Sequence, residues 1–136
     1  MRTLFLIIFI LASGMSSYGQ IDKSEFYGSW TVKRVLEKPS DPDFEPLIDG
    51  FSKANFKFQE NGDFSLITES ESPMFQMVTE MTNNTKWKFD SKEQLIRIGG
   101  EEDGYSIMGI YPKRNNETFE FFIDEGGMTF EMEKSK

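Results

Sequence analysis

The side chains that most often carry out acid–base, nucleophilic or zinc chemistry are missing from this sequence, which contains no histidine and no cysteine. The usual general base, the usual thiol nucleophile and the usual zinc ligand sets are therefore excluded. Carboxylates are plentiful, but they gather in polar stretches such as Glu101, Glu102 and Asp103, where we expect them to be solvated. A weak Ca²⁺ site there is the alternative, although no EF-hand spacing surrounds it. We predict that the protein is not an enzyme and holds no metal or cofactor.

Three methionines could offer a different chemistry. Met74, Met77 and Met81 repeat at helical spacing, and their thioethers are soft ligands of the kind that bind Cu(I). Methionine also fills irregular apolar surfaces, and the histidine that often accompanies copper is absent. We favour an apolar lid over a copper site.

Arg34 is the cation whose position is most informative. It shares one face of an alternating segment with Trp30, Val32 and Leu36, and we assign that face to the protein interior. A buried cation is costly unless it is paired, and a ligand carboxylate is one such partner. The alternative is that Arg34 lies at the rim of the fold, where it reaches solvent or pairs with a glutamate.

The elements that position these side chains are strands. Apolar and polar residues alternate with a period of two through most of the chain, which indicates strands with one buried face. Asn61-Gly62 is the strongest hairpin signal, because both residues tolerate positive φ. Eight strands joined mainly to their sequence neighbours predict an all-β fold, an up-and-down antiparallel meander closed into a barrel. The predicted strands lie around residues 30–36, 54–58, 64–66, 87–89, 96–98, 105–111, 119–123 and 128–132.

Two long connections interrupt the meander, and each predicts a short amphipathic helix. In each, apolar residues recur at i, i+3, i+4 and i+7, and Ser72-Pro73 offers an N-cap and a first-turn proline to the second. We expect one or two such helices to act as lids over a barrel end. The apolar positions are Phe44, Leu47, Ile48 and Phe51 in the first connection, and Met74, Met77, Val78 and Met81 in the second.

The two parts of the chain differ in composition. Residues 1–19 combine Arg2, an apolar run over 4–12 and the small residues Ser17 and Gly19, which is typical of a cleavable signal peptide. The run is shorter than the roughly 20 residues that span a bilayer; an uncleaved anchor is the alternative. We therefore predict one domain over residues 20–136, secreted or periplasmic, with no membrane span after cleavage.

The net charge and the composition of the chain limit the kinds of partner that we expect. The chain has 15 basic and 23 acidic side chains and a net charge of −8, which argues against nucleic acid and anionic membrane surfaces as partners. Without cysteine there are no disulfides, so apolar burial must stabilise the fold. Aromatic residues make up 15% of the sequence and supply that apolar area.

Three motifs resemble those of small bacterial lipocalin-like domains, which are calycin-type β-barrels. They are Gly28-Ser29-Trp30, Asn61-Gly62-Asp63-Phe64 and Trp87-Lys88-Phe89. The resemblance implies that Trp30 plugs the closed end of the barrel as a structural anchor and that a basic side chain, here Lys134, packs across it. The second lipocalin signature, an acid-containing turn before the penultimate strand, is not recognisable around Tyr111.

The resemblance also implies binding of a small hydrophobic or amphiphilic molecule inside the barrel. The alternative is that phenylalanines fill the interior, because eight strands leave space only for side chains or one small ligand. The protein would then be a solid-core barrel that interacts with a protein or envelope component. A connected void of about 300 Å³ or more would favour the carrier. The candidate ligand-binding residues are Val32, Arg34, Phe56, Phe58, Phe64, Leu66, Trp87, Phe89, Tyr105, Ile107, Phe119 and Phe121.

Overall fold

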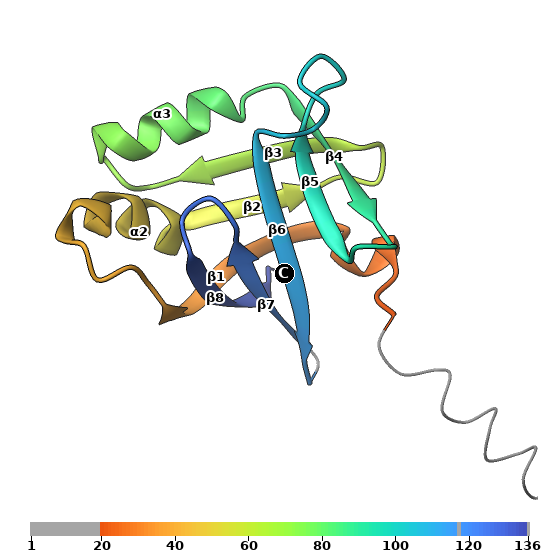
Figure 1. Cartoon of the computed structure of the whole chain (residues 1–136), viewed down its shortest axis with the longest axis horizontal. Helices are drawn as coiled ribbons and strands as arrows, with labels where there is room; N and C mark the ends of the chain where they lie inside the picture. Colours follow the sequence, from red (N-terminus) through yellow and green to blue (C-terminus); the bar gives the residue numbers. More distant parts are fainter. Residues whose placement is uncertain (1–19, 117, 136) are drawn as a thin grey trace, which may run out of the picture.

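Eight antiparallel strands form a closed barrel in the computed structural model, which describes residues 20–116 and 118–135 (Figure 1). The predicted signal peptide over residues 1–19 lies outside the described residues. The strands follow one another around the barrel, so the predicted all-β meander is confirmed. They are β1 (Gly28–Glu37), β2 (Ala54–Phe58), β3 (Asp63–Thr68), β4 (Thr85–Asp90), β5 (Leu95–Gly99), β6 (Met108–Asn115), β7 (Thr118–Ile123) and β8 (Met128–Lys134).

Strand β1 closes the barrel by pairing with β2 on one edge and with β8 on the other. Trp30 is opposite Phe56 of β2 and opposite Lys134 of β8. Because both edges of β1 are paired, neither is exposed to another chain.

The pairing of β1 with β8 contains two register shifts, one between Val32 and Arg34 and one between Val35 and Glu37. Each shift leaves a residue without a partner, and such bulges change which side chains face inward. Val35 therefore packs against the core, while Leu36 is 41% exposed. We predicted that Trp30, Val32, Arg34 and Leu36 face the interior. This prediction is wrong beyond Val32, because inward and outward side chains do not alternate strictly there.

Strands β3 and β4 pair over two residues only. Asp63 is opposite Lys86 and Phe64 is opposite Thr85, and the remainder of β3 has no partner on that side. Helix α3 (Pro73–Met81) runs beside this part of β3 in the connection between the two strands (Figure 1). The barrel is therefore least tightly paired at this seam.

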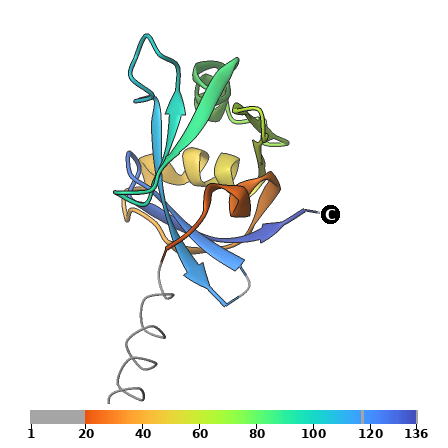
Figure 2. The same cartoon turned by 90° about the vertical axis from the view of Figure 1, so that its right-hand side faces the viewer.

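Aromatic side chains fill the barrel from wall to wall. Phe26 belongs to the 3₁₀ helix η1 (Lys23–Phe26), which precedes β1 and lies across one end of the barrel (Figure 2). Its ring centroid lies 5.0 Å from that of Phe119 and 5.2 Å from that of Phe89. The Phe58 ring of β2 lies 5.1 Å from Trp87 of β4, two strands further along the barrel. These contacts join strands that are not neighbours, so the aromatic cluster extends across the interior of the barrel.

The other end of the barrel is covered by two helices, as predicted. Helix α2 (Glu45–Ser52) follows the 3₁₀ turn η2 (Pro42–Phe44), and Ser72 caps α3 by accepting a hydrogen bond from the Phe75 backbone N–H. Phe51 of α2 meets Phe75 of α3 edge to face at 4.8 Å. Gly50 lies directly against the Phe75 ring, which leaves no space for a side chain at that position.

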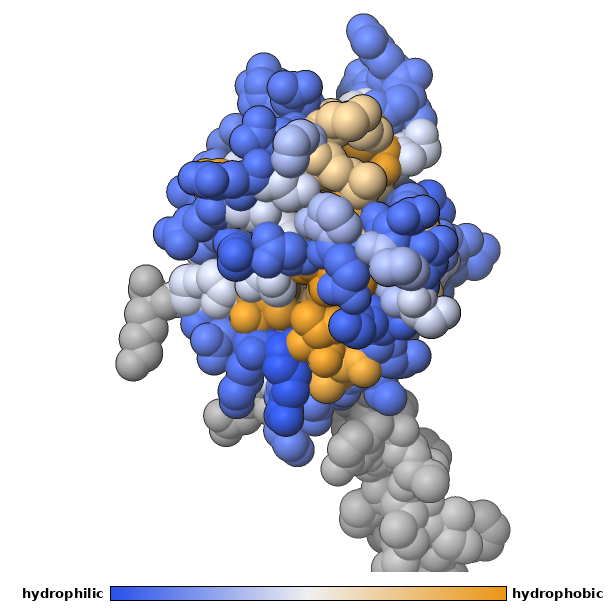
Figure 3. All heavy atoms as spheres, turned by 90° about the vertical axis from the view of Figure 1, so that its left-hand side faces the viewer, coloured by the Kyte–Doolittle hydropathy of each residue, from blue (hydrophilic) through white to orange (hydrophobic). Residues whose placement is uncertain are grey.

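Phe75, and none of the methionines, is the buried side chain of α3. Phe75 is fully buried, whereas Met74, Met77 and Met81 are largely exposed. Figure 3 shows apolar areas reaching the surface on the side of the molecule where α2 and α3 lie. The helical spacing was predicted correctly, but Phe75 rather than methionine inserts because the inner face of α3 is rotated from the expected one.

Strand β6 begins three residues later than predicted and extends further. Residues 105–107 form the end of a turn in which Tyr105 has a φ of 56°. Strand β5 pairs with β6 only from Met108 to Ile110, so Pro112 lies beyond that pairing. A proline in a strand is tolerated where its missing N–H has no partner strand, and β6 can therefore continue to Asn115.

The contact between Gly50 and Phe75 can be tested by adding one methyl group. A Cβ atom at Gly50 would lie 2.0 Å from Phe75 Cγ, so Gly50→Ala should lower the free energy of unfolding by about 1–3 kcal/mol. Helix propensity alone would raise it by about 1 kcal/mol. Gly100→Ala is the matched control, since nothing lies within 4 Å of its Cβ position. Urea denaturation would measure both variants; a stabilised Gly50→Ala would contradict the packing.

Candidate functional site

The lidded end of the barrel contains a small pocket between the two helices and the rim. Its volume is about 170 Å³. The two helices α2 and α3 form one side, and the other side is formed by the start of β6 with the residue before it, by the end of β7, by the start of β8 and by the turn between β7 and β8. The lining residues are Leu47, Phe51, Val78, Met81, Thr82, Ile107, Met108, Ile123, Glu125, Gly126 and Met128.

Most of this lining is apolar, and Glu125 supplies its single ionisable side chain. The residue as a whole is exposed, but its Oε1 accepts a hydrogen bond from the Gly109 backbone N–H at 2.9 Å. Partial removal of the carboxylate from water raises the pKa of Glu125, with a smaller contribution from the neighbouring Asp124 charge. The pocket therefore has apolar walls and one carboxyl group whose pKa is raised.

Most of the candidate ligand-binding residues belong to the hydrophobic core cluster. Seven of them are buried, and Val32 and Phe89 pack partly buried against the same cluster. Ile107 is the one candidate that lines the lidded pocket. The seven buried candidates are Phe56, Phe58, Phe64, Leu66, Trp87, Phe119 and Phe121.

The structure places Arg34 as the alternative interpretation of the sequence had it, reaching solvent and paired with a glutamate, and it corrects the expected position of Tyr105. Arg34 lies on the outside of the barrel, where its Nε forms an ion pair with Glu131 Oε2. This hydrogen bond holds the pKa of Glu131 below its usual value. Tyr105 lies in the turn before β6, with Lys88 Nζ 4.1 Å from its ring centroid. The bulge in β1 moves Arg34 outward, and the late start of β6 leaves Tyr105 outside the strand.

The closed end of the barrel is built around Trp30, which is 3% exposed. Its indole Nε1 donates a hydrogen bond to the Phe26 carbonyl at 2.9 Å, which ties η1 to the first strand. Lys134 Nζ lies 5.6 Å from the Trp30 ring centroid, where the lipocalin resemblance implied a basic side chain. This cluster anchors the end of the barrel opposite the lids.

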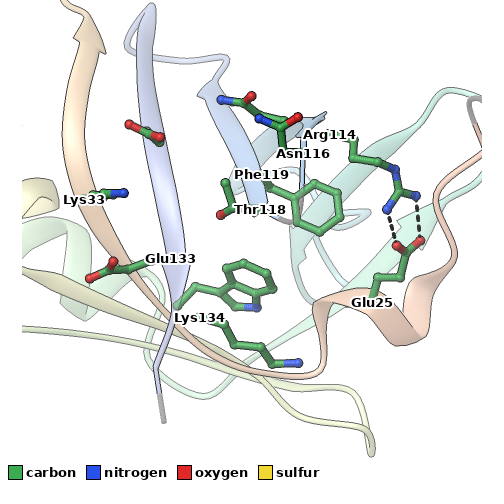
Figure 4. A pocket seen from close by; sticks show the side chains of 11 residues that line it. Glu25, Lys33, Arg114, Asn116, Thr118, Phe119, Glu133 and Lys134 are labelled. Atoms are coloured by element: carbon green, nitrogen blue, oxygen red, sulfur yellow. Dashed lines mark hydrogen bonds and ion pairs between the residues drawn. The ribbon is translucent and has the colours of Figure 1, made fainter.

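Beside this anchor, a surface cleft of about 700 Å³ opens to solvent (Figure 4). Its lining combines both signs of charge, and Arg114 pairs with Glu25 through two contacts of 2.5 and 3.1 Å. The hydrogen bond from Arg114 lowers the pKa of Glu25. Lys33, Lys134, Glu131 and Glu133 also line the cleft.

Two further findings concern the described residues as a whole. Residues 20–116 and 118–135 include no cluster of three or more Asp and Glu side chains arranged to hold a metal ion. Within the same residues, none of the helices has the length and apolar character needed to cross a membrane.

Sequence reasoning missed the part of the site that depends on the turn between β7 and β8. Glu125 stands between Asp124 and Gly126-Gly127, a pattern typical of a solvated turn. Only the folding of this turn onto Gly109 of β6 brings its carboxylate to the pocket. The contribution of the two helices to the pocket was predictable from the sequence, because the helical spacing of apolar residues included Leu47, Phe51 and Val78.

In comparisons with known proteins, no family model, curated protein sequence or solved structure matches this chain.

The raised pKa of Glu125 predicts a specific pH dependence. A carboxylate whose pKa is raised in the folded state costs stability once the pH exceeds its unfolded value of 4.5, and the cost is complete above the folded pKa. The Glu125→Gln substitution removes this cost, and the amide oxygen of the glutamine can still accept the hydrogen bond from the Gly109 N–H. The variant should match the wild type near pH 4 and become more stable than it as the pH rises to 7.

Thermal melting at several pH values would measure this difference. Glu102→Gln, at an exposed position in the turn before β6, is the control and should give no comparable trend. A Glu125→Gln variant whose advantage shrinks with rising pH would contradict the assignment.

Proposed function

We propose that this protein is an exported, non-enzymatic, lipocalin-like binding protein that holds a compact, neutral apolar group in the pocket at its lidded end. The observation that carries the proposal is the apolar pocket between α2, α3 and the barrel rim. The filled core argues for this site over the barrel interior as the place where a ligand binds.

The size of the pocket limits the ligand. An engineered apolar cavity of about 150 Å³ in another protein stays dry and binds benzene. A pocket of about 170 Å³ is comparable. Pockets for drug-sized molecules are larger, about 300–1,000 Å³. A single ring or a short branched hydrocarbon group therefore fits, and a whole long-chain fatty acid would require the lids to open.

The charge of the pocket favours neutral ligands. Arg34, which was the candidate partner for a carboxylate, lies outside the barrel and is already paired with Glu131. Glu125, the ionisable group in the lining, repels anions when it is ionised. We therefore expect alcohols and hydrocarbons to bind better than the corresponding acids.

The remaining parts of the proposal have separate support. The lipocalin-like assignment is supported by the eight-stranded meander, by the buried Trp30 at the closed end, and by Lys134 across its ring. Export is supported by the signal-peptide pattern of residues 1–19. A role in binding rather than catalysis is supported by the absence of histidine and cysteine from the sequence.

Benzyl alcohol and benzoate form a matched pair of ligands for testing the proposal by NMR titration at pH 7. Benzyl alcohol should saturate the amide signals around the pocket with a Kd of about 1 mM, or about −4 kcal/mol. Benzoate should bind at least about tenfold more weakly, a difference of about 1.4 kcal/mol. Val78→Phe, which places a larger side chain in the pocket, should abolish binding of the alcohol.

Met77→Phe is the control, because Met77 neighbours Val78 on the same helix but is 63% exposed and does not line the pocket. This variant should bind benzyl alcohol like the wild type. Equal binding to wild type and Val78→Phe, or signal changes confined to other parts of the barrel, would refute the site.

A further inference from the structure

Strand β3 has an open edge beyond Phe64. Its pairing with β4 ends at Phe64, whereas its pairing with β2 continues to Thr68. The segment 65–68 is therefore paired on one side only, and at about 3.3 Å per residue it spans about 13 Å.

The main-chain groups that face this edge can be identified by alternation. The Gly62 carbonyl accepts a hydrogen bond from the Trp87 N–H at 2.9 Å, so Gly62 faces β4, and the Asp63 carbonyl accepts from the Gln59 N–H on the β2 side. Successive residues of a strand direct their N–H and C=O groups to opposite sides. The main-chain N–H and C=O groups of Leu66 and Thr68 therefore point towards the open edge. Among the described residues, none forms a hydrogen bond with these four groups on that side.

A groove of about 420 Å³ lies along this edge. One wall is the strand and the segment that follows it, and the other wall is α3 with the turn after it. The edge is thus flanked by a helix but not covered by it. The lining residues are Leu66, Ile67, Thr68, Ser70, Gln76, Thr79, Glu80 and Asn83.

The groove has both an apolar and an acidic feature. Ile67 points outward from β3 and is 64% exposed beside the open edge. Glu80 lines the groove, and Glu69 and Glu71 are exposed on either side of Ser70 at its end. The cations near the groove are Lys57, opposite Ser65 on β2, and Lys86, which is paired with Asp63 at 2.9 Å. Lys53 lies at the Ser70 end, where it pairs at 3.1 Å with Asp49, and the second carboxylate oxygen of Asp49 accepts a hydrogen bond from Ser70. Since Lys53 is balanced by Asp49, and Glu69, Glu71 and Glu80 belong to none of the ion pairs among the described residues, this end of the groove has an excess of negative charge.

We propose that this groove binds an extended peptide segment of a partner protein by strand addition, with the segment antiparallel to β3 and in line with β4. Leu66 and Thr68 each offer one donor and one acceptor to the partner main chain. An apolar partner side chain packs on Ile67, and a lysine or arginine meets Glu80 and its acidic neighbours. The partner is therefore an extended segment that alternates basic and apolar residues.

The probe is an acetylated and amidated hexapeptide of alternating lysine and valine, titrated into the protein and followed by hydrogen exchange. Binding should protect the amides of Leu66 and Thr68. Two isomers, N-methylated at all valines or at all lysines, separate main-chain pairing from simple charge attraction. One isomer should lose binding at least about tenfold, because its N–H groups towards β3 are blocked, and the other should retain it.

Glu80→Lys should weaken binding of the peptide about threefold or more, and the loss should diminish at high salt. Glu101→Lys makes the same change of charge in a turn outside the groove and is the control. The proposal is overturned if both methylated isomers bind alike, if the protected amides lie elsewhere, or if the peptide does not bind at 1 mM. Protection of Leu66 and Thr68 that depends on protein concentration without peptide would assign the edge to a second copy instead.

Discussion

The packing of aromatic rings inside the barrel is the interaction on which the other features depend. Phe26 enters from η1, outside the strands, and contacts Phe119 and Phe89 on different walls. Eight strands enclose a space only wide enough for side chains or one small ligand, and here the side chains occupy it. Because the chain has no disulfides, this burial also supplies the stabilisation of the fold, at about 25 cal/mol per Å² of apolar surface. Because the interior contributes this stability, both of the proposed binding surfaces lie at an end or an edge of the barrel.

Two departures from a regular meander determine where those binding surfaces lie. The bulges in β1 turn Arg34 towards Glu131 on the outer surface, and no Lys or Arg is among the buried side chains of residues 20–116 and 118–135. The short pairing of β3 with β4 opens the seam in which α3 lies. The same helix serves both surfaces, since Val78 lines the apolar pocket and Glu80 lines the groove beside β3. A partner bound at one surface is therefore close to the helix that forms part of the other.

The two ends of the barrel differ in whether a cation pairs with the carboxylate that lies there. At the closed end, Arg114 satisfies Glu25 and lowers its pKa, and Lys134 covers the Trp30 ring. At the lidded end, Glu125 accepts a hydrogen bond from a backbone N–H, but no cation is among the groups that shift its pKa. Burial therefore raises the pKa of Glu125. The closed end thus has the character of a structural anchor, while the lidded end retains an imperfectly solvated acid beside apolar walls. This contrast agrees with a binding site under the lids.

The sequence alone determined the strands and their order, because period-two alternation and turn residues such as Asn61-Gly62 are local signals. It also determined both lid helices, through the spacing of Phe44 to Phe51 and the cap at Ser72-Pro73. Tertiary structure decided the direction of Arg34, the place of Tyr105 and the role of Glu125. Register shifts arise from pairing between β1 and β8, about 100 residues apart in the chain, and alternation within one strand does not record them. Whether the interior is hollow was likewise a tertiary property, because the free volume depends on how rings from η1 and from non-adjacent strands meet.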